Sequence, residues 1–229
     1  MTAVKICGIQ DLPSARAAIQ AGAALLGINF HPPSPRFLAP HTAAELVVSI
    51  RDEFGSESPT IVGIFVEQTP VKIIETMALS GVDAAQLTGK NSHPAIADLA
   101  DRAYVAIRPR DAEEAGELVR QFRQDRETAD PLPAILVDSY HSHQYGGTGE
   151  LTALSIAAAA IAECDRVMLA GGLTPLNVAT RIKELQPWGV DVASGVETSA
   201  GEKDVTLIQQ FIAAVHTSET QRFNASTCG

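Results

Sequence analysis

Short apolar runs alternate with longer amphipathic segments along almost the entire chain. The runs are rich in Val, Ile, Leu and Ala, which is typical of strands buried on both faces of a parallel sheet. The segments between them place apolar residues three or four positions apart, which predicts helices that cover such a sheet. The predicted strands are residues 4–9, 24–30, 60–66, 82–87, 103–107, 134–137, 166–170 and 190–193. The predicted helices are residues 11–21, 42–53, 71–79, 94–99, 111–123 and 203–215, with two more that begin after Gly149 and at Pro175.

Residues at the helix ends support these boundaries. Asp11 is a suitable N-cap for the first helix, and Gly22 is a suitable stop. Thr42 followed by Glu45 has the spacing of a capping box. Pro175 would stand at the first helical position, where the missing N–H of proline costs nothing.

Eight strands, each followed by a helix, predict the α/β class and a single (β/α)8 (TIM) barrel over residues 1–215. Residues 216–229 have no periodic apolar pattern, so we expect a C-terminal tail without regular structure. An open, doubly wound sheet is the alternative, since periodicity does not reveal whether the sheet closes. The first strand is not followed by G-x-G-x-x-G, which argues against that alternative.

Composition narrows the class of protein. The 229 residues are 45% hydrophobic and 19% charged, and the formal charge of −10 argues against partners such as nucleic acid or an anionic membrane. The three cysteines, Cys7, Cys164 and Cys228, are scattered and lack zinc-type spacing, which fits a reducing compartment. There is no apolar run of about 18 to 20 residues and no basic leader, so we expect a cytoplasmic protein.

The first strand carries the most reactive side chain among the candidates. Alternation places Lys5 and Cys7 on one face, with Cys7 at the strand end, where barrel active sites form. Taken alone, Cys7 is better explained as a small core residue than as a reactive thiol. Asp138 ends the sixth strand, where a capping aspartate is the simpler explanation. Together, Cys7 and Asp138 form a candidate acid–base pair across the barrel.

Glycines follow the last two strands. Gly171-Gly172 and Ser194-Gly195 stand where barrels frequently bind phosphate, because exposed backbone N–H groups there can approach an anion closely. The alternative is that each glycine pair only forms a turn. The presence of two such pairs, one at each expected position, makes this alternative the weaker one.

Arg36 lies in a loop stiffened by prolines, and this loop could present the guanidinium to a carboxylate. A surface arginine is the alternative. Arg108 also stands at a strand end. His141 and His143 share a face of an extended segment, but no third ligand is in register, so we expect no metal site there.

Several motifs resemble the phosphoribosylanthranilate isomerase family, in order along nearly the whole chain. They are Lys5-Ile6-Cys7-Gly8-Ile9, Ser34-Pro35-Arg36, Gly63-Ile64-Phe65-Val66, Gln86-Leu87-x-Gly89, Tyr145-Gly146-Gly147-Thr148-Gly149, Leu169-Ala170-Gly171-Gly172-Leu173-Thr174-Pro175-x-Asn177-Val178, Val190-Asp191-Val192-x-Ser194-Gly195-Val196-Glu197 and Gly201-x-Lys203-Asp204.

The resemblance implies the Amadori rearrangement of N-(5-phosphoribosyl)anthranilate in tryptophan biosynthesis, without a metal or organic cofactor. It implies Cys7 as general base and Asp138 as general acid. For these roles we expect burial to raise the carboxyl pKa and a nearby cation such as Lys5 to lower the thiol pKa. The implied partner is a small phosphoribosyl substrate, and the protein would be a monomer or a homodimer. The expected substrate-binding residues are Lys5, Arg36, Thr88 and Asp191, and the expected phosphate-binding residues are Gly147, Gly171, Gly172, Ser194 and Gly195.

This chain departs from the family pattern at three places. Thr88 stands where the family commonly has histidine, Glu150 begins an altered segment after Gly149, and Arg108-Pro109-Arg110 is unusually basic. Two alternatives therefore stay open. One is another sugar-phosphate aldose–ketose isomerase or epimerase, and the other is a catalytically silent relative that binds phosphosugars.

Overall fold

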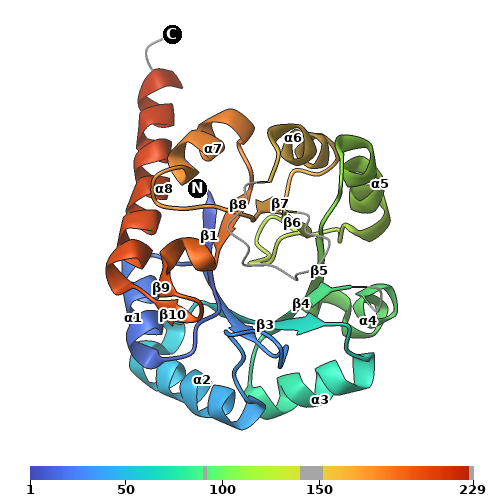
Figure 1. The fold of residues 1–229 in the computed structure, drawn as a ribbon, viewed down its shortest axis with the longest axis vertical. Helices are drawn as coiled ribbons and strands as arrows, with labels where there is room; N and C mark the ends of the chain where they lie inside the picture. Colours follow the sequence, from blue (N-terminus) through green and yellow to red (C-terminus); the bar gives the residue numbers. More distant parts are fainter. Residues whose placement is uncertain (90–91, 140–151, 227–229) are drawn as a thin grey trace.

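The computed structural model describes residues 1–89, 92–139 and 152–226. Eight parallel strands form a closed barrel in which each strand pairs with the next and β8 pairs with β1 (Figure 1). The predicted (β/α)8 barrel is therefore confirmed. The strands are β1 Ala3–Cys7, β2 Leu25–Asn29, β3 Thr60–Val66, β4 Ala84–Thr88, β5 Ala103–Ile107, β6 Ile135–Val137, β7 Val167–Leu169 and β8 Gly189–Val192. The helices are α1 Leu12–Ala21, α2 Pro40–Phe54, α3 Pro70–Ser80, α4 Ser92–Leu99, α5 Ala112–Phe122, α6 Leu154–Glu163, α7 Val178–Leu185 and α8 Val205–Ser226.

Alternation along the strands separates two apolar layers. The larger layer lies between the strands and the surrounding helices. A second layer fills the barrel interior, with Leu25, Val62, Tyr104, Leu136 and Met168 among its members. Each fully buried side chain of this size contributes about 1.5 to 3 kcal/mol. The interior is consequently a packed core, and only its C-terminal end is open to form a site.

The start of α2 differs from the prediction. Asp11 does cap α1, where its Oδ1 accepts from the Ser14 N–H at 2.8 Å. In α2, by contrast, the helix begins at Pro40 and Ala39 is the N-cap, so the capping box of Thr42 and Glu45 is wrong. Proline already has the φ of a helix and lacks one unsatisfied N–H, so no side-chain cap is needed.

Pro175 does not begin a helix. It lies in a turn, and α7 starts at Val178. Asn177 holds this turn, because its Oδ1 accepts from the Thr174 N–H at 2.8 Å and its Nδ2 donates to the Gly172 carbonyl at 3.0 Å. The amide side chain thus stabilises an additional turn before the helix.

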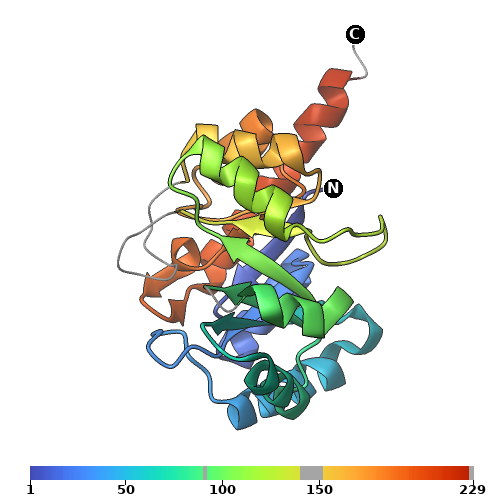
Figure 2. The ribbon, with the colours of Figure 1, turned by 90° about the vertical axis from the view of Figure 1, so that its right-hand side faces the viewer.

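The C-terminal segment is more ordered than expected. Helix α8 runs to Ser226 and projects beyond the barrel (Figure 1, Figure 2), so the predicted tail without regular structure is wrong for residues 216–226. Residues 216–226 contain no glycine or proline that would end the helix. The segment also contacts α1, since a Cβ at Gly22 would lie 3.2 Å from Cε1 of His216.

A short antiparallel hairpin follows β8, where the sequence predicted none. It consists of β9 Glu197–Ser199 and β10 Glu202–Lys203, and it is preceded by the 3-10 turn Ser194–Val196. Its strands are too short and polar to show an alternating pattern. In the described part of the chain, no helix combines the length and hydrophobicity needed to cross a membrane.

Candidate active site

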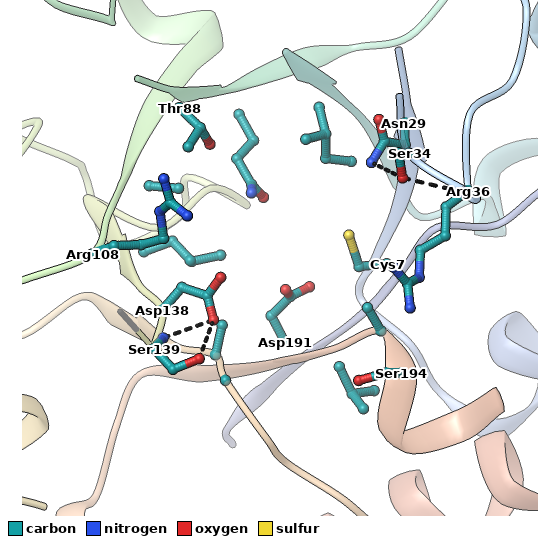
Figure 3. Close-up of a pocket in the computed structure, with 18 of the residues that line it drawn as sticks. Cys7, Asn29, Ser34, Arg36, Thr88, Arg108, Asp138, Ser139, Asp191 and Ser194 are labelled. Carbon is teal, nitrogen blue, oxygen red and sulfur yellow. Dashed lines mark hydrogen bonds between the residues drawn. The ribbon is translucent and has the colours of Figure 1, made fainter. Parts of the chain in front are cut away.

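A pocket opens at the C-terminal end of the barrel (Figure 3). The side chains around it come from strand ends and from the loops that follow them, as the barrel architecture requires. Ten of the predicted rim and phosphate-site residues line this pocket: Cys7, Arg36, Thr88, Arg108, Asp138, Gly171, Gly172, Asp191, Ser194 and Gly195. Gly147, His141 and His143 lie outside the described residues. Among the described residues, no group of three or more His, Cys, Asp or Glu side chains is placed to hold a metal ion.

Cys7 lies at the end of β1 and is buried, with 9% of its surface exposed. Burial raises the pKa of its thiol, because the thiolate is poorly solvated there. Lys5 and Lys203 oppose this rise, and Asp191 adds to it. The net pKa is raised, so the predicted lowering of the thiol pKa is wrong, although Lys5 acts in the expected direction.

Lys5 lies one rung below Cys7, inside the barrel. Its side chain is fully buried and is not part of the pocket lining, so a role of Lys5 in binding substrate stays a prediction. Its Nζ donates to Asp191 Oδ1 at 2.8 Å and to Gln86 Oε1 at 3.0 Å. Burial by itself lowers the pKa of Lys5, but the charge of Asp191, the hydrogen bond to it and the weaker effects of Cys7 and Tyr104 together outweigh burial and raise the pKa, so Lys5 is a cation.

Tyr104 completes this arrangement from β5. Its hydroxyl donates to Gln86 Oε1 at 3.1 Å, and the side chain is fully buried. We call Lys5, Asp191, Gln86 and Tyr104 the inner cluster. Of the two charged members, the carboxylate of Asp191 lines the pocket, while the ammonium of Lys5 lies beneath it.

Asp138 lies directly after β6, on the side of the pocket across from Cys7 (Figure 3). It is half-buried, and its Oδ1 accepts from the Ser139 backbone N–H at 2.8 Å. Its own N–H donates to the Ile107 carbonyl at 3.0 Å, which fixes the main chain at this position. Thr88 and Arg108 line the pocket beside it.

Arg36 is buried at the rim and is already bound by a carboxylate. Its Nε donates to Glu197 Oε1 at 2.7 Å, and its Nη2 donates to Glu197 Oε2 at 2.6 Å. Lys203 also donates to Glu197 Oε1, at 2.6 Å. Burial alone would raise the pKa of Glu197, but the two cations outweigh it and lower the pKa. We call Arg36, Glu197 and Lys203 the rim cluster, and of its members only Arg36 lines the pocket.

Gly8, in the loop after β1, allows the side chain of Arg36 to approach the main chain closely. Its φ is +78°, which favours glycine, and a Cβ there would lie 2.6 Å from Cδ of Arg36. On the other side, Ser34 Oγ accepts from the Arg36 backbone N–H at 3.1 Å and from Asn29 Nδ2 at 3.2 Å. The loop thus fixes both the main chain and the side chain of Arg36.

The glycine loops after β7 and β8 are in direct contact. A Cβ at Gly195 would overlap the carbonyl oxygen of Leu173, and a Cβ at Gly171 would lie 2.6 Å from Thr152 Oγ1. Only glycine permits this approach, so the two loops form one backbone surface at the edge of the pocket. Binding of phosphate to it stays a prediction.

Comparison with known proteins agrees with this geometry. Residues 4–214 match the model of the N-(5'-phosphoribosyl)anthranilate isomerase family. The chain belongs to this family. A relative so named from Pelobacter propionicus is 37% identical over 212 residues, which cover 93% of this chain and 94% of that protein. Another from Geobacter sp. (strain M21) is 38% identical over 93% of this chain and 97% of its own.

Solved structures of the family have the same fold. The phosphoribosylanthranilate isomerase of Thermotoga maritima superposes with a TM-score of 0.80 at 30% identity, covering 95% of this chain and all of that one. A second family structure, in complex with reduced 1-(o-carboxyphenylamino)-1-deoxyribulose 5-phosphate, gives a TM-score of 0.75 at 28% identity over 95% of this chain and all of that one.

Residue patterns in the sequence did not identify every side chain that organises the site. Gln86 shares the inward face of β4 with Thr88, so alternation could have found it. Glu197 and Lys203 lie within the family motifs, but nothing in the sequence shows that they meet Arg36. Their contact depends on the hairpin register, in which Lys203 pairs with Glu197.

Proposed function

We propose that this protein converts N-(5-phosphoribosyl)anthranilate into 1-(2-carboxyphenylamino)-1-deoxyribulose 5-phosphate. The observation that carries the proposal is the placement of Cys7 and Asp138 on opposite sides of one pocket, between the glycine loops and Arg36. Family membership supports the same reaction. A ligand with a phosphate and a carboxylate at its two ends fits this distribution of donors.

The reaction follows from general acid and base catalysis. Asp138, when protonated, donates its proton to the furanose ring oxygen, and the C1–O bond breaks to give an iminium ion. Cys7, as the thiolate, then removes the C2 proton, and the electron pair moves toward the iminium nitrogen to form an enolamine. Tautomerisation gives the ketone. Because the substrate nitrogen accepts the electrons, the proposed steps involve no metal or organic cofactor.

The raised pKa of Cys7 makes its ionisation a demanding step. Lys5 provides a positive charge beneath the thiol, and the iminium ion adds a second one near C2 once the ring has opened. Both charges favour the thiolate. In this scheme Lys5 acts through Cys7 and Asp191 without touching the substrate.

A turnover assay that follows the loss of substrate fluorescence tests this proposal. We expect turnover by the wild type and a loss of about 10²- to 10⁴-fold in kcat for Cys7→Ser and for Asp138→Asn. Binding of the reduced product analogue without turnover would instead indicate a catalytically silent relative. Full rates in both variants would contradict the assigned roles. A cytoplasmic location and a monomeric or dimeric state stay predictions from the sequence.

A further inference from the structure

The rim cluster connects Arg36 to the loop that follows β8. Glu197 holds Arg36 through two hydrogen bonds from one edge of the guanidinium. Lys203 donates to Glu197 at 2.6 Å and also to the carbonyl oxygen of Ala193 at 2.8 Å. Ala193 directly precedes Ser194, where the second glycine loop begins. One ammonium group thus contacts both the partner of Arg36 and the base of that loop.

The cluster is shielded from solvent. The side chains of Lys203, Glu197 and Arg36 are 1%, 3% and 9% exposed. Bidentate arginine–carboxylate pairs fix the guanidinium plane, and charge-assisted hydrogen bonds are roughly twice as strong as neutral ones. Such burial is expensive unless each charge is paired.

Neither Glu197 nor Lys203 lines the pocket. Any effect that they have on a ligand is therefore indirect, through Arg36, through the main chain at Ala193 or, for Lys203, through its charge near Cys7. Glu197 accepts one hydrogen from Nε and one from Nη2, whereas a guanidinium has five N–H donors. Arg36 accordingly retains further donors with which to bind a carboxylate.

We propose that Glu197 and Lys203 are positioning residues, in which Glu197 orients Arg36 for the substrate carboxylate and Lys203 links that arginine to the phosphate-binding loop. The identity of the ligand rests on the proposed function. The hairpin is the element that makes this link, because its register places Lys203 opposite Glu197.

Calorimetric titration with three probes tests the proposal: the reduced product analogue, anthranilate and inorganic phosphate. For Glu197→Gln we expect binding of the analogue and of anthranilate to weaken about tenfold, because a charge-assisted pair is lost, while phosphate binding is unchanged. For Lys203→Met we expect all three to weaken. In turnover, Glu197→Gln should raise KM more than it lowers kcat.

A double-mutant cycle separates positioning from a general structural effect. Adding Glu197→Gln to Arg36→Ala should weaken analogue binding no further, because Glu197 acts through Arg36. Glu53→Gln is the matched control, since Glu53 accepts from Nε and Nη2 of Arg16 at 2.5 and 2.8 Å on the outer surface. This control should leave all three titrations unchanged.

The outcomes are distinct. If wild type binds the analogue and Glu197→Gln binds it equally tightly, the positioning role is overturned. Further weakening in the Arg36→Ala background, or weakened phosphate binding in Glu197→Gln, also overturns it. If wild type binds the analogue but does not turn over substrate, the proposed function fails while the titrations still decide the positioning role. If wild type binds neither analogue nor anthranilate, both proposals are overturned.

Discussion

The inner cluster and the rim cluster place opposite charges in the same pocket. In the inner cluster, the carboxylate of Asp191 lines the pocket and the ammonium of Lys5 backs it from the barrel interior. In the rim cluster, the guanidinium of Arg36 lines the pocket and the carboxylate of Glu197 backs it from the hairpin. The two arrangements are the same except that the signs of the charges are exchanged.

This exchange shows how a chain with a formal charge of −10 can prepare a site for an anion. The global field repels such a ligand, so local charges must be held in fixed positions. Each charge that lines the pocket is oriented by a counter-charge behind it, which costs desolvation but limits the movement of the lining group. The clusters differ in location. The inner cluster depends on the barrel itself, and the rim cluster depends on a loop and a hairpin.

Lys5→Met should have the largest effect on stability and should leave the rim cluster intact. Removal of the ammonium leaves Asp191 beside the barrel interior without its cation, which costs about 3 to 5 kcal/mol when a buried pair loses one partner. Urea unfolding measures this loss. Lys72→Met is the matched control, since Lys72 lies 3.6 Å from Glu75 with a side chain that is 62% exposed. A loss in Lys5→Met no larger than in the control would contradict the role of the inner cluster.

Gln86→Leu should have the next largest effect. Gln86 Oε1 accepts from both Lys5 Nζ and Tyr104 Oη, so its removal leaves a buried hydroxyl without its acceptor. We expect a loss of about 1 to 3 kcal/mol in the free energy of unfolding. Tyr104→Phe in the same background should recover part of this loss, because the unpaired hydroxyl is then absent. If the double variant is less stable than Gln86→Leu, the explanation is wrong.

Gly8→Ala should affect the rim cluster and leave the inner one intact. The φ of +78° strains an alanine, at a cost of about 1 to 2 kcal/mol, and the new Cβ displaces Cδ of Arg36. We therefore expect a higher KM with a smaller change in kcat. Gly55→Ala has a φ of +51° but meets nothing within 4 Å, so it is the control for strain alone. Equal KM values in both variants would show that Arg36 does not depend on this close approach.

The difference between the clusters also explains how much the sequence could predict. Period-two alternation predicts which strand residues share a face, so it placed Lys5 and Cys7 on one face of the first strand, as the structure does. The barrel rule then predicted the end at which the site forms. The alternation of strands and helices and the glycine loops follow from local patterns that are strong enough to be found in one sequence, whereas closure of the sheet does not.

The rim cluster could not be predicted in this way. Arg36 and Glu197 are 161 positions apart, and their contact depends on a two-strand hairpin without a hydrophobic pattern. The predicted direction of the Cys7 pKa shift was also wrong. The sequence shows that Lys5 is close to Cys7, but it does not show the burial, whose effect on the pKa outweighs that of Lys5. Helix α8 was predicted too short, because the loss of the apolar pattern after residue 215 does not end a helix in a segment without glycine or proline.

The smallest expected effect is a shift in the pH at which Cys7 loses its proton, and this shift distinguishes the inner cluster from the rim cluster. Because burial raises the thiol pKa, alkylation of Cys7 by iodoacetamide should rise about tenfold per pH unit and reach its midpoint above the ordinary value of about 8.5. Lys5→Met should move that midpoint further upward, since the cation that favours the thiolate is lost. Glu197→Gln should leave it unchanged.

Mass spectrometry of the peptide containing Cys7 measures the rate at each pH. An unchanged midpoint in Lys5→Met would show that Lys5 does not stabilise the thiolate, and a shift in Glu197→Gln alone would assign that role to the rim cluster.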